Sequence, residues 1–213
     1  ARREPTVAAT VVPRERLEAP GVRIADVLRS VPGVQIADTG GLGAPASALV
    51  RGATASHTPV YLGGIRLNDD VAGVADLGGV PPWFLSRIEV YRGHAPIEAD
   101  RLGMGGALFL EPRRPGRAEL SVGVLGGSFR TQGAWVRAGA PLAGGGVLAG
   151  VAAEGSANDY VYNDDGGTLL VPGSSTQRPR PNADARVLDA WALGATTLGS
   201  VQLGVVTNAM ARE

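Results

Sequence analysis

The first half of this chain takes its pattern from Val60-Tyr61-Leu62-Gly63-Gly64-Ile65-Arg66-Leu67-Asn68, in which two short apolar runs flank a pair of glycines. Two consecutive glycines can adopt the positive φ angles of a two-residue hairpin turn, so a hairpin is expected at Gly63-Gly64. Similar apolar runs, each bounded by Gly, Pro, Asn or Asp, occur at 34–36, 48–50, 88–91 and 107–110. Such punctuation favours short strands joined by tight turns.

Two helices are predicted among these strands. Ile24, Val27, Leu28 and Val31 have the i, i+3, i+4, i+7 spacing of one helix face, and Pro32-Gly33 ends the pattern, which gives a helix near 22–31. Proline is favoured at the first position of a helix, so Pro81-Pro82 predicts a second helix at 82–87. The first half therefore reads as a small α+β domain, followed by a linker at 113–116.

The second half has a different texture, because apolar and polar residues alternate with a period of two. This is typical of strands with one face exposed to a different environment from the other. Turns of Gly and small residues at 126–128, 143–146 and 198–200 separate them. The predicted strands are 117–126, 129–140, 145–156, 184–198 and 200–212. A polar stretch at 160–180 is too long for a hairpin turn and is expected to be a long surface loop. A membrane barrel and a soluble sandwich both fit this pattern.

Composition excludes several function classes. The chain has 20 basic and 20 acidic residues, so no net positive charge favours nucleic acid. It contains no lysine and no cysteine, which removes the phosphate-loop lysine, lysine bases, disulfides and thiolate metal sites. We find no motif of a catalytic nucleophile or acid–base pair, so an enzyme is not expected. The chain contains no run of about 18 apolar residues, so no transmembrane helix is predicted.

Four motifs occur in order along the first domain. They are Ala25-Asp26-Val27-Leu28-Arg29-Ser30-Val31-Pro32-Gly33-Val34, Val50-Arg51-Gly52, the segment 60–68 and Arg87-Ile88-Glu89-Val90-Tyr91-Arg92-Gly93. Together they resemble the plug of TonB-dependent outer-membrane receptors, of the vitamin B12 and siderophore transporter type. The resemblance implies a plug domain at 1–115, followed at 116–213 by the first antiparallel strands of a transmembrane β-barrel.

The sequence departs from the family pattern at several positions, among them residues 98–102, which lack the family's aromatic-Gly pair. Gly63 stands where the family usually has Asp, and His94 stands where Pro is usual. Residues 6–17 match the first plug strand, so the energy-coupling TonB box is expected upstream of this chain, with 4–9 as a weaker alternative. Transporters of this type close about 22 strands around a plugged lumen, so the barrel predicted here is incomplete.

The resemblance also implies roles for charged plug residues. Arg51, Glu89 and Arg92 occupy motif positions, and such charges are expected to face carboxylates of the barrel wall and hold the plug in the lumen. The alternative is that they are solvated charges at strand edges. A charge enclosed by a barrel needs a partner, which favours the first interpretation.

Outward-facing plug loops and extracellular barrel loops hold the solute in this family. They correspond here to 40–47, 54–58, 68–73 and 160–167. The candidate solute-binding residues are Thr54, Ser56, His57, Asn68, Asp69, Tyr160 and Tyr162. Exposed polar loops often have such residues without any ligand. Oxygen ligands suit calcium, so Asp159, Asn163, Asp164 and Asp165 are weak calcium candidates, although a solvated acidic turn is the simpler interpretation. His57 and His94 lack the spacing of a helical metal pair. No other cofactor is expected.

The function implied by the resemblance is active uptake of a scarce, bulky solute, such as a siderophore-iron complex or cobalamin, across the outer membrane. The expected partners are this solute, outer-membrane lipid and the TonB-ExbB-ExbD complex. The alternative is a β-rich binding module at the surface or in the periplasm that transports nothing.

Overall fold

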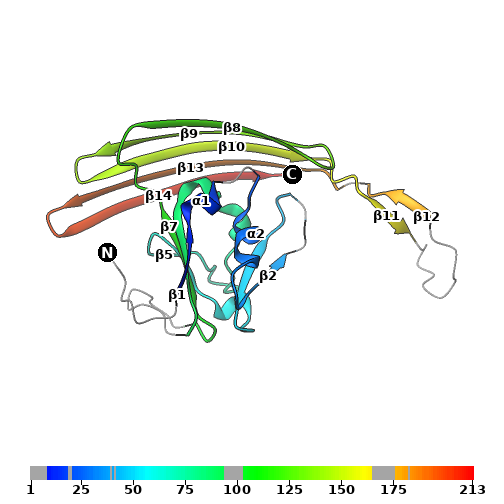
Figure 1. The fold of residues 1–213 in the computed structure, drawn as a ribbon, viewed down its shortest axis with the longest axis horizontal. Helices are drawn as coiled ribbons and strands as arrows, with labels where there is room; N and C mark the ends of the chain where they lie inside the picture. The colour runs from blue at the N-terminus through cyan, green and yellow to red at the C-terminus, as the bar shows by residue number, and fades with distance from the viewer. Residues whose placement is uncertain are drawn as a thin grey trace.

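The computed structural model describes residues 9–18, 21–38, 40, 42–93, 103–164, 176–181 and 183–213. They form an N-terminal domain of short strands and helices and a long curved sheet that arches over it (Figure 1). The last strand of the N-terminal domain ends at Pro112, and the first long strand begins at Glu119. The predicted domain boundary at 115/116 falls in this connection.

A five-stranded mixed sheet organises the N-terminal domain. Its strand order is β1-β6-β7-β4-β5, with β4 parallel to β7 and the other pairs antiparallel. The strands are β1 (Ala9–Pro13), β4 (Val60–Leu62), β5 (Ile65–Arg66), β6 (Leu85–Tyr91) and β7 (Ala107–Pro112). A separate pair is formed by β2 (Val34–Asp38) and β3 (Ala46–Val50). The helical segments are α1 (Arg14–Leu17), α2 (Ile24–Arg29) and the 3₁₀ turns η1 (Ala55–His57), η2 (Leu77–Gly79) and η3 (Pro82–Phe84).

The predicted hairpin at Gly63-Gly64 is confirmed. Leu62 pairs with Ile65, and both glycines have positive φ, 58° and 93°. A residue with a Cβ rarely adopts such angles, so the glycine pair determines this turn. The helix predicted at 22–31 is also present, shortened to α2.

The helix predicted at 82–87 is wrong. Pro82–Phe84 is a single 3₁₀ turn, and the chain then enters β6 at Leu85. Leu85, Ile88 and Val90 are fully buried in the sheet. β-branched side chains pack well in strands, and the tertiary burial of these residues overrides the start signal given by the prolines.

Five long antiparallel strands, ordered β14-β13-β10-β9-β8, form what we call the wall. They are β8 (Glu119–Gly127), β9 (Thr131–Leu142), β10 (Gly145–Ser156), β13 (Ala185–Leu198) and β14 (Val201–Arg212). All five were predicted, with bounds within about two residues, because their alternation is a local signal. Among the described residues, none of the helices is long and apolar enough to cross a membrane.

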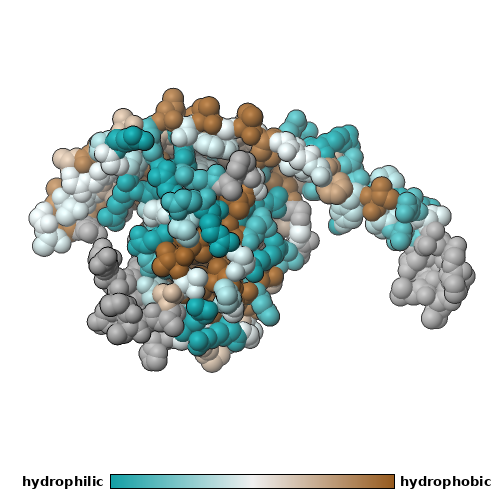
Figure 2. Space-filling view, viewed as in Figure 1, coloured by the Kyte–Doolittle hydropathy of each residue, from teal (hydrophilic) through white to brown (hydrophobic). Residues whose placement is uncertain are grey.

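The wall has two chemically different faces. The convex face is exposed and apolar, as the hydrophobic side chains along the outer edge in Figure 2 show. Its members include Leu120, Val122, Val124, Val136, Val151, Leu188 and Val205. On the concave face, Leu148, Trp191 and Leu193 pack with residues of the N-terminal domain in one hydrophobic core. Phe84 of η3 lies at the centre of this contact, with its ring 5.2 Å from that of Trp191.

Residues 160–180 were predicted as a long surface loop, and the structure corrects this by showing two short strands within it. They contain β11 (Val161–Asp164) and β12 (Thr176–Pro179), which pair antiparallel. The hairpin projects beyond one end of the wall (Figure 1). Pairing between the two strands satisfies their backbone N–H and C=O groups where no core is available. Because the stretch is polar throughout, its sequence did not predict these strands.

Candidate functional site

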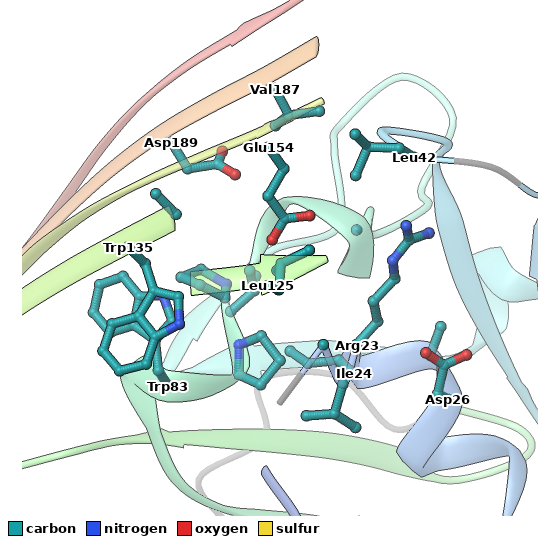
Figure 3. Close-up of a pocket in the computed structure, with 18 of the residues that line it drawn as sticks. Arg23, Ile24, Asp26, Leu42, Trp83, Leu125, Trp135, Glu154, Val187 and Asp189 are labelled. Carbon is teal, nitrogen blue, oxygen red and sulfur yellow. The ribbon is translucent and has the colours of Figure 1, made fainter. Parts of the chain in front are cut away.

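The candidate site is the contact between the N-terminal domain and the concave face of the wall. A cavity of about 530 Å³ lies there, bounded by α1, the start of α2, the segment after β2, and residues of β8, β9, β10 and β13. This volume is within the range of small-molecule sites. Figure 3 shows side chains from both domains converging on it.

Charged side chains gather at one edge of the cavity. Arg137 of β9 is buried, and its Nη2 donates to Glu18 Oε1 at 3.0 Å while its Nη1 donates to the carbonyl oxygen of Trp83 at 3.1 Å. Arg113, 5% exposed at its side chain, contacts the same Glu18 oxygen at 3.5 Å and donates to both oxygens of Glu119. Arg14 is the third arginine on Glu18, at 2.8 Å. The group joins both domains and the connection between them.

The pKa of Glu18 reflects these contacts. Partial burial alone would raise the pKa, but hydrogen bonds from Arg14 and Arg137, with their positive charges, outweigh it and lower the pKa below its ordinary value. A carboxylate with a lowered pKa stabilises the fold above its unfolded pKa, and the contribution is lost as pH falls through the folded pKa. Glu18 is therefore ionised and engaged at neutral pH.

The pKa of Arg113 is also lowered, mainly by burial and by the positive charges of Arg137 and Arg14, against which Glu119 and Glu18 act. Arginine stays protonated at any pH of interest even so. The two carboxylates are thus needed to balance the charge of a buried guanidinium.

A second ion pair joins the domains at η2. Arg212 of β14 donates through Nη1 to Asp76 Oδ2 at 3.1 Å. The other oxygen of Asp76 accepts from the backbone amides of Gly78 at 2.8 Å and Ala46 at 3.1 Å. Asp76 therefore ties η2, the start of β3 and the wall together.

Aromatic and acidic residues complete the cavity. The indole of Trp83 packs against the wall at Gly150, where a Cβ would lie 2.5 Å from Trp83 Cη2, so only glycine leaves room for it. Glu154 of β10 and Asp189 of β13 project from the wall into the cavity, opposite Arg23 (Figure 3). The cavity thus combines indole surfaces with carboxylates and arginines that come from both domains.

The charged residues chosen from the motifs make their described contacts inside the N-terminal domain. Glu89 is buried, with Arg87 at 2.6 Å and the Tyr91 hydroxyl donating to it at 2.8 Å. Arg92 donates to Thr10 Oγ1 at 2.6 Å and to the carbonyl oxygen of Pro32 at 3.1 Å. Arg51 is exposed and has a φ of 52° at the turn after β3. Contacts of these three with barrel carboxylates stay a prediction.

Three of the candidate solute-binding residues lie together, with Thr54 immediately before η1 and Ser56 and His57 on it. Thr54 Oγ1 lies 3.0 Å from both Ser56 Oγ and His57 Nδ1, and all three side chains are at least partly exposed. The loop 68–73 is adjacent, because a Cβ on Gly73 would lie 3.3 Å from Ser56 Cβ. The structure therefore brings these two predicted loops side by side.

Asn68 and Asp69 are engaged within that loop. The Asn68 side chain is buried; its oxygen accepts from the Val60 amide at 2.8 Å and its nitrogen donates to the carbonyl oxygens of Gly73 and Thr58. Asp69 accepts from the backbone amides of residues 71, 72 and 74. These bonds, the one from Ala72 first, lower the pKa of the Asp69 carboxyl. Both side chains shape the loop.

Replacing Asn68 with alanine is expected to destabilise this loop and the start of β4 by about 1–3 kcal/mol, because the Val60 amide would be left buried without an acceptor. Hydrogen exchange at the Val60 amide should accelerate accordingly. Asp70→Ala, at an exposed neighbour, is the control. Unchanged exchange at Val60 in Asn68→Ala would show that the side chain does not hold the loop.

The remaining candidates are on the projecting hairpin and beside it. Tyr160 packs edge-on against Phe129 at 5.9 Å, and Arg180 lies over its ring and donates to its hydroxyl. Tyr162 on β11 is 38% exposed. These tyrosines lie away from η1 in the chain, and no described contact joins them to the candidates at η1.

The calcium candidates have arginine partners. Asp159 lies 2.8 Å from Arg130, and Asp164 lies 3.4 Å from Arg178. Asp165 and His94 lie outside the described residues. Within the ranges that the structure describes, no three acidic or histidine residues are grouped so as to hold a metal ion. Calcium binding stays untested.

Sequence reasoning missed Glu18, Arg113, Arg137, Asp76 and Arg212. One signal was available for Arg137: it lies in β9 on the phase opposite to Ala134 and Val136, so alternation already placed it on the inner face. Its partner, however, is 119 residues away in the chain, and nothing local indicates that pairing.

Comparison with known proteins identifies the family of this chain. Residues 1–107 match the model of the TonB-dependent receptor plug domain. The chain is 34% identical over 144 residues to the vitamin B12 transporter BtuB of Photobacterium profundum, covering 66% of this chain and 24% of that transporter. It is 33% identical over 103 residues to BtuB of Vibrio vulnificus, covering 48% and 17%. The chain thus spans a quarter or less of the length of these relatives.

Solved structures agree in fold. The pyoverdine outer membrane receptor FpvA of Pseudomonas aeruginosa PAO1 matches 96% of this chain and 27% of the receptor, with a TM-score of 0.68 and 17% identity. The copper transporter OprC matches 100% of this chain and 31% of the transporter, with a TM-score of 0.67 and 15% identity. At such identities the likeness shows the fold alone.

Proposed function

The chain belongs to the TonB-dependent receptor plug family, and from that premise we propose that it supplies the plug and the first barrel strands of an active importer for a scarce, bulky solute. Its place is the outer membrane, as for the receptors that it resembles. The relatives are named as transporters and receptors, which supports binding and translocation and not catalysis.

One observation carries the proposal: the outer face of the wall is apolar and exposed, whereas its charged side chains lie on the inner face, which packs on the plug. Val124, 84% exposed, and Leu120, 72% exposed, lie on the outer face, whereas the charged residues Arg137 and Asp189 turn inward. Strands of a membrane barrel alternate in this way, with lipid on one side and the lumen on the other. A soluble binding module has no need of a convex apolar face of this extent.

Cobalamin is the solute we propose, with a siderophore-iron complex as the second candidate. Two curated relatives above 30% identity are vitamin B12 transporters, whereas the siderophore receptors support the fold only. The group Thr54, Ser56 and His57 offers hydroxyl and imidazole hydrogen bonds to amide or phosphate groups of such a ligand.

The mechanism proposed is the one general to the family. The solute binds over the plug, an upstream TonB box becomes available, and the TonB-ExbB-ExbD complex pulls the plug so that a path opens along the wall. The plug–wall contacts described above must then break and reform in each cycle. No calcium or other cofactor is required by this scheme.

The test is uptake by the full-length receptor in a strain that lacks its own vitamin B12 transporter. We expect cobalamin-dependent growth and binding of labelled cobalamin to isolated outer membranes, with binding but no uptake when TonB is deleted. Binding of ferric siderophores in place of cobalamin would revise the solute. Absence of any uptake, with a protein that binds macromolecules instead, would favour the non-transporting module.

His57→Ala should weaken cobalamin binding by roughly 2–10-fold, the effect of losing one hydrogen bond of about 0.5–1.5 kcal/mol. Gln35→Ala, at another exposed plug position, should have no effect. Titration of outer-membrane vesicles with labelled cobalamin measures both. Equal affinities for the two variants would remove His57 from the solute site.

A further inference from the structure

We propose that a notch on the outer face of the wall binds lipid A, the lipid of the outer leaflet of the outer membrane. The notch is part of a shallow groove of about 640 Å³. Its floor and rim are formed by Ala134, Ala153, Gly155, Gln132 and Arg186. Binding there depends on the position of the wall in the membrane and is independent of the transported solute.

Strand pairing arranges the outward side chains near this end of the wall in three rows. The row nearest the end consists of Gly126, Gln132, Gly155, Arg186 and Glu213. The second row consists of Val124, Ala134, Ala153, Leu188 and Ala211. The third row consists of Val122, Val136, Val151, Ala190 and Ala209. Of these rows, the first alone contains polar side chains, so the boundary between lipid headgroups and acyl chains falls between the first row and the second.

The notch is a gap in the first two rows. In the first row, Gly155 places no side chain between Gln132 of β9 and Arg186 of β13. Neighbouring strands lie about 4.8 Å apart, so the backbones at those two positions are separated by roughly 10 Å. In the second row, two adjacent alanines lie between the larger side chains of Val124 and Leu188. The gap therefore continues from the polar row into the apolar one, as a ligand with a polar head and a hydrocarbon chain requires.

The packing of the protein itself does not require glycine at position 155. A Cβ on Gly155 would lie 3.8 Å from the carbonyl oxygen of Ala185 and 3.9 Å from Arg186 Cγ, which are ordinary contacts, and its φ is not one of the positive values. Gly150 in the same strand is different, because a Cβ there would lie 2.5 Å from Trp83 Cη2. Glycine inside a strand weakens it and often marks a place where a ligand approaches the backbone. The opening at Gly155 is explained by such a ligand on the outer face.

The chemistry of the notch suits a phosphate joined to an acyl chain. Arg186 is exposed, and its guanidinium can donate two parallel hydrogen bonds to a phosphate. The exposed amide of Gln132, across Gly155, adds a donor and an acceptor. Leu188, 50% exposed, borders the apolar part of the gap. Glu213 lies on the far side of Arg186, and a guanidinium with five N–H donors can contact both this carboxylate and a phosphate.

The end of the wall at which the notch lies determines the leaflet. The notch is at the end from which the hairpin β11–β12 projects (Figure 1). At the opposite end, β9 and β10 are joined by residues 143–144, and β13 and β14 by residues 199–200. Membrane barrels have short periplasmic turns and longer extracellular loops, so the notch faces the outer leaflet. Lipid A, a phosphorylated sugar with several acyl chains, has both the phosphate and the chains that the notch fits.

The test is a titration of the full-length receptor with purified lipid A. The receptor is purified from outer membranes, its lipids are removed by detergent exchange, and bound lipid A is measured by native mass spectrometry. Gly155→Leu fills the notch and should weaken lipid A binding about tenfold, the effect of losing contact with about two methylene groups. Arg186→Gln removes the phosphate ligand and should weaken binding about tenfold or more, as for the loss of a charge-assisted hydrogen bond.

Gly126→Leu is the matched control, because Gly126 lies in the same row beyond Gln132 and a Cβ there meets no atom within 4 Å. It should leave the affinity for lipid A unchanged. Heat-modifiable migration shows that each variant has folded, and Arg186→Gln, at an exposed position, keeps the test available if Gly155→Leu does not fold. Unchanged affinity in either folded variant, or an equal loss in Gly126→Leu, would overturn the proposal.

Other probes distinguish lipid A from other occupants. Dephosphorylated lipid A should bind the unmodified receptor about as weakly as lipid A binds Arg186→Gln, and inorganic phosphate should not displace lipid A. Equal affinity for phosphatidylglycerol would overturn the choice of lipid A, and so would a receptor dimer that Gly155→Leu dissociates, since the notch would then hold a second copy. None of these measurements uses cobalamin or TonB, so failure to take up the solute and failure to bind lipid A are separate results.

Discussion

Val122→Arg is expected to prevent insertion of the receptor into the outer membrane. Val122 lies at the centre of β8, is 72% exposed on the convex face, and is aligned with Val136 and Val151 across β9 and β10. An arginine facing lipid near the midplane costs about 2–4 kcal/mol and also interrupts this apolar band. Quantitative immunoblotting of outer-membrane fractions should show roughly a tenfold loss of folded receptor or more, with degradation in the periplasm.

Leu125→Arg provides a matched control in the same strand. Leu125 is on the opposite face and lines the cavity, which also contains Glu154 as a carboxylate partner. The Leu125→Arg receptor should therefore be recovered in the outer-membrane fraction in amounts close to those of the unmodified protein. If Val122→Arg inserted normally while Leu125→Arg did not, the assignment of the two faces would be reversed.

Phe84→Ala is expected to lower the free energy of unfolding of the plug–wall unit by about 3–5 kcal/mol. The ring is fully buried and packs against Trp191 at 5.2 Å and Trp83 at 6.0 Å, so its loss removes apolar contact and leaves a cavity between the domains. Both neighbours are tryptophans, so urea unfolding followed by tryptophan fluorescence reports on this contact directly.

Phe129→Ala is the control for that measurement. Phe129 is 49% exposed at the turn between β8 and β9, and its removal should cost no more than about 1 kcal/mol. Similar unfolding midpoints for the two variants would mean that Phe84 does not join plug and wall, and that the domains are held by other contacts.

Most of the fold could be predicted from local patterns in the sequence. The glycine pair at Gly63-Gly64 gave the hairpin because only a residue without a Cβ takes both positive φ values easily, and alternation gave the wall strands because a strand at an interface between two media must alternate. The error at η3 had the same origin: the prolines gave a correct local start, but burial of Leu85 and Ile88 in the sheet decided what followed.

The candidate site was less accessible from sequence because its pairs are distant in the chain. Glu18 meets Arg137 across 119 residues, and Asp76 meets Arg212 across 136. Motif positions directed attention to Arg51, Glu89 and Arg92, of which the last two make described contacts inside the plug. The one available signal was the alternation in β9, which places the charged Arg137 on the inner face of the strand. This signal identifies the wall residue but not its partner.

Heat-modifiable migration of the full-length receptor in fractionated cells shows whether this chain is part of a plugged outer-membrane barrel. We expect the protein to be recovered in the outer-membrane fraction and to migrate faster in an unheated gel sample than in a heated one, because a folded barrel resists detergent. Recovery in a soluble fraction, with the same migration before and after heating, would contradict it and leave a non-transporting binding module.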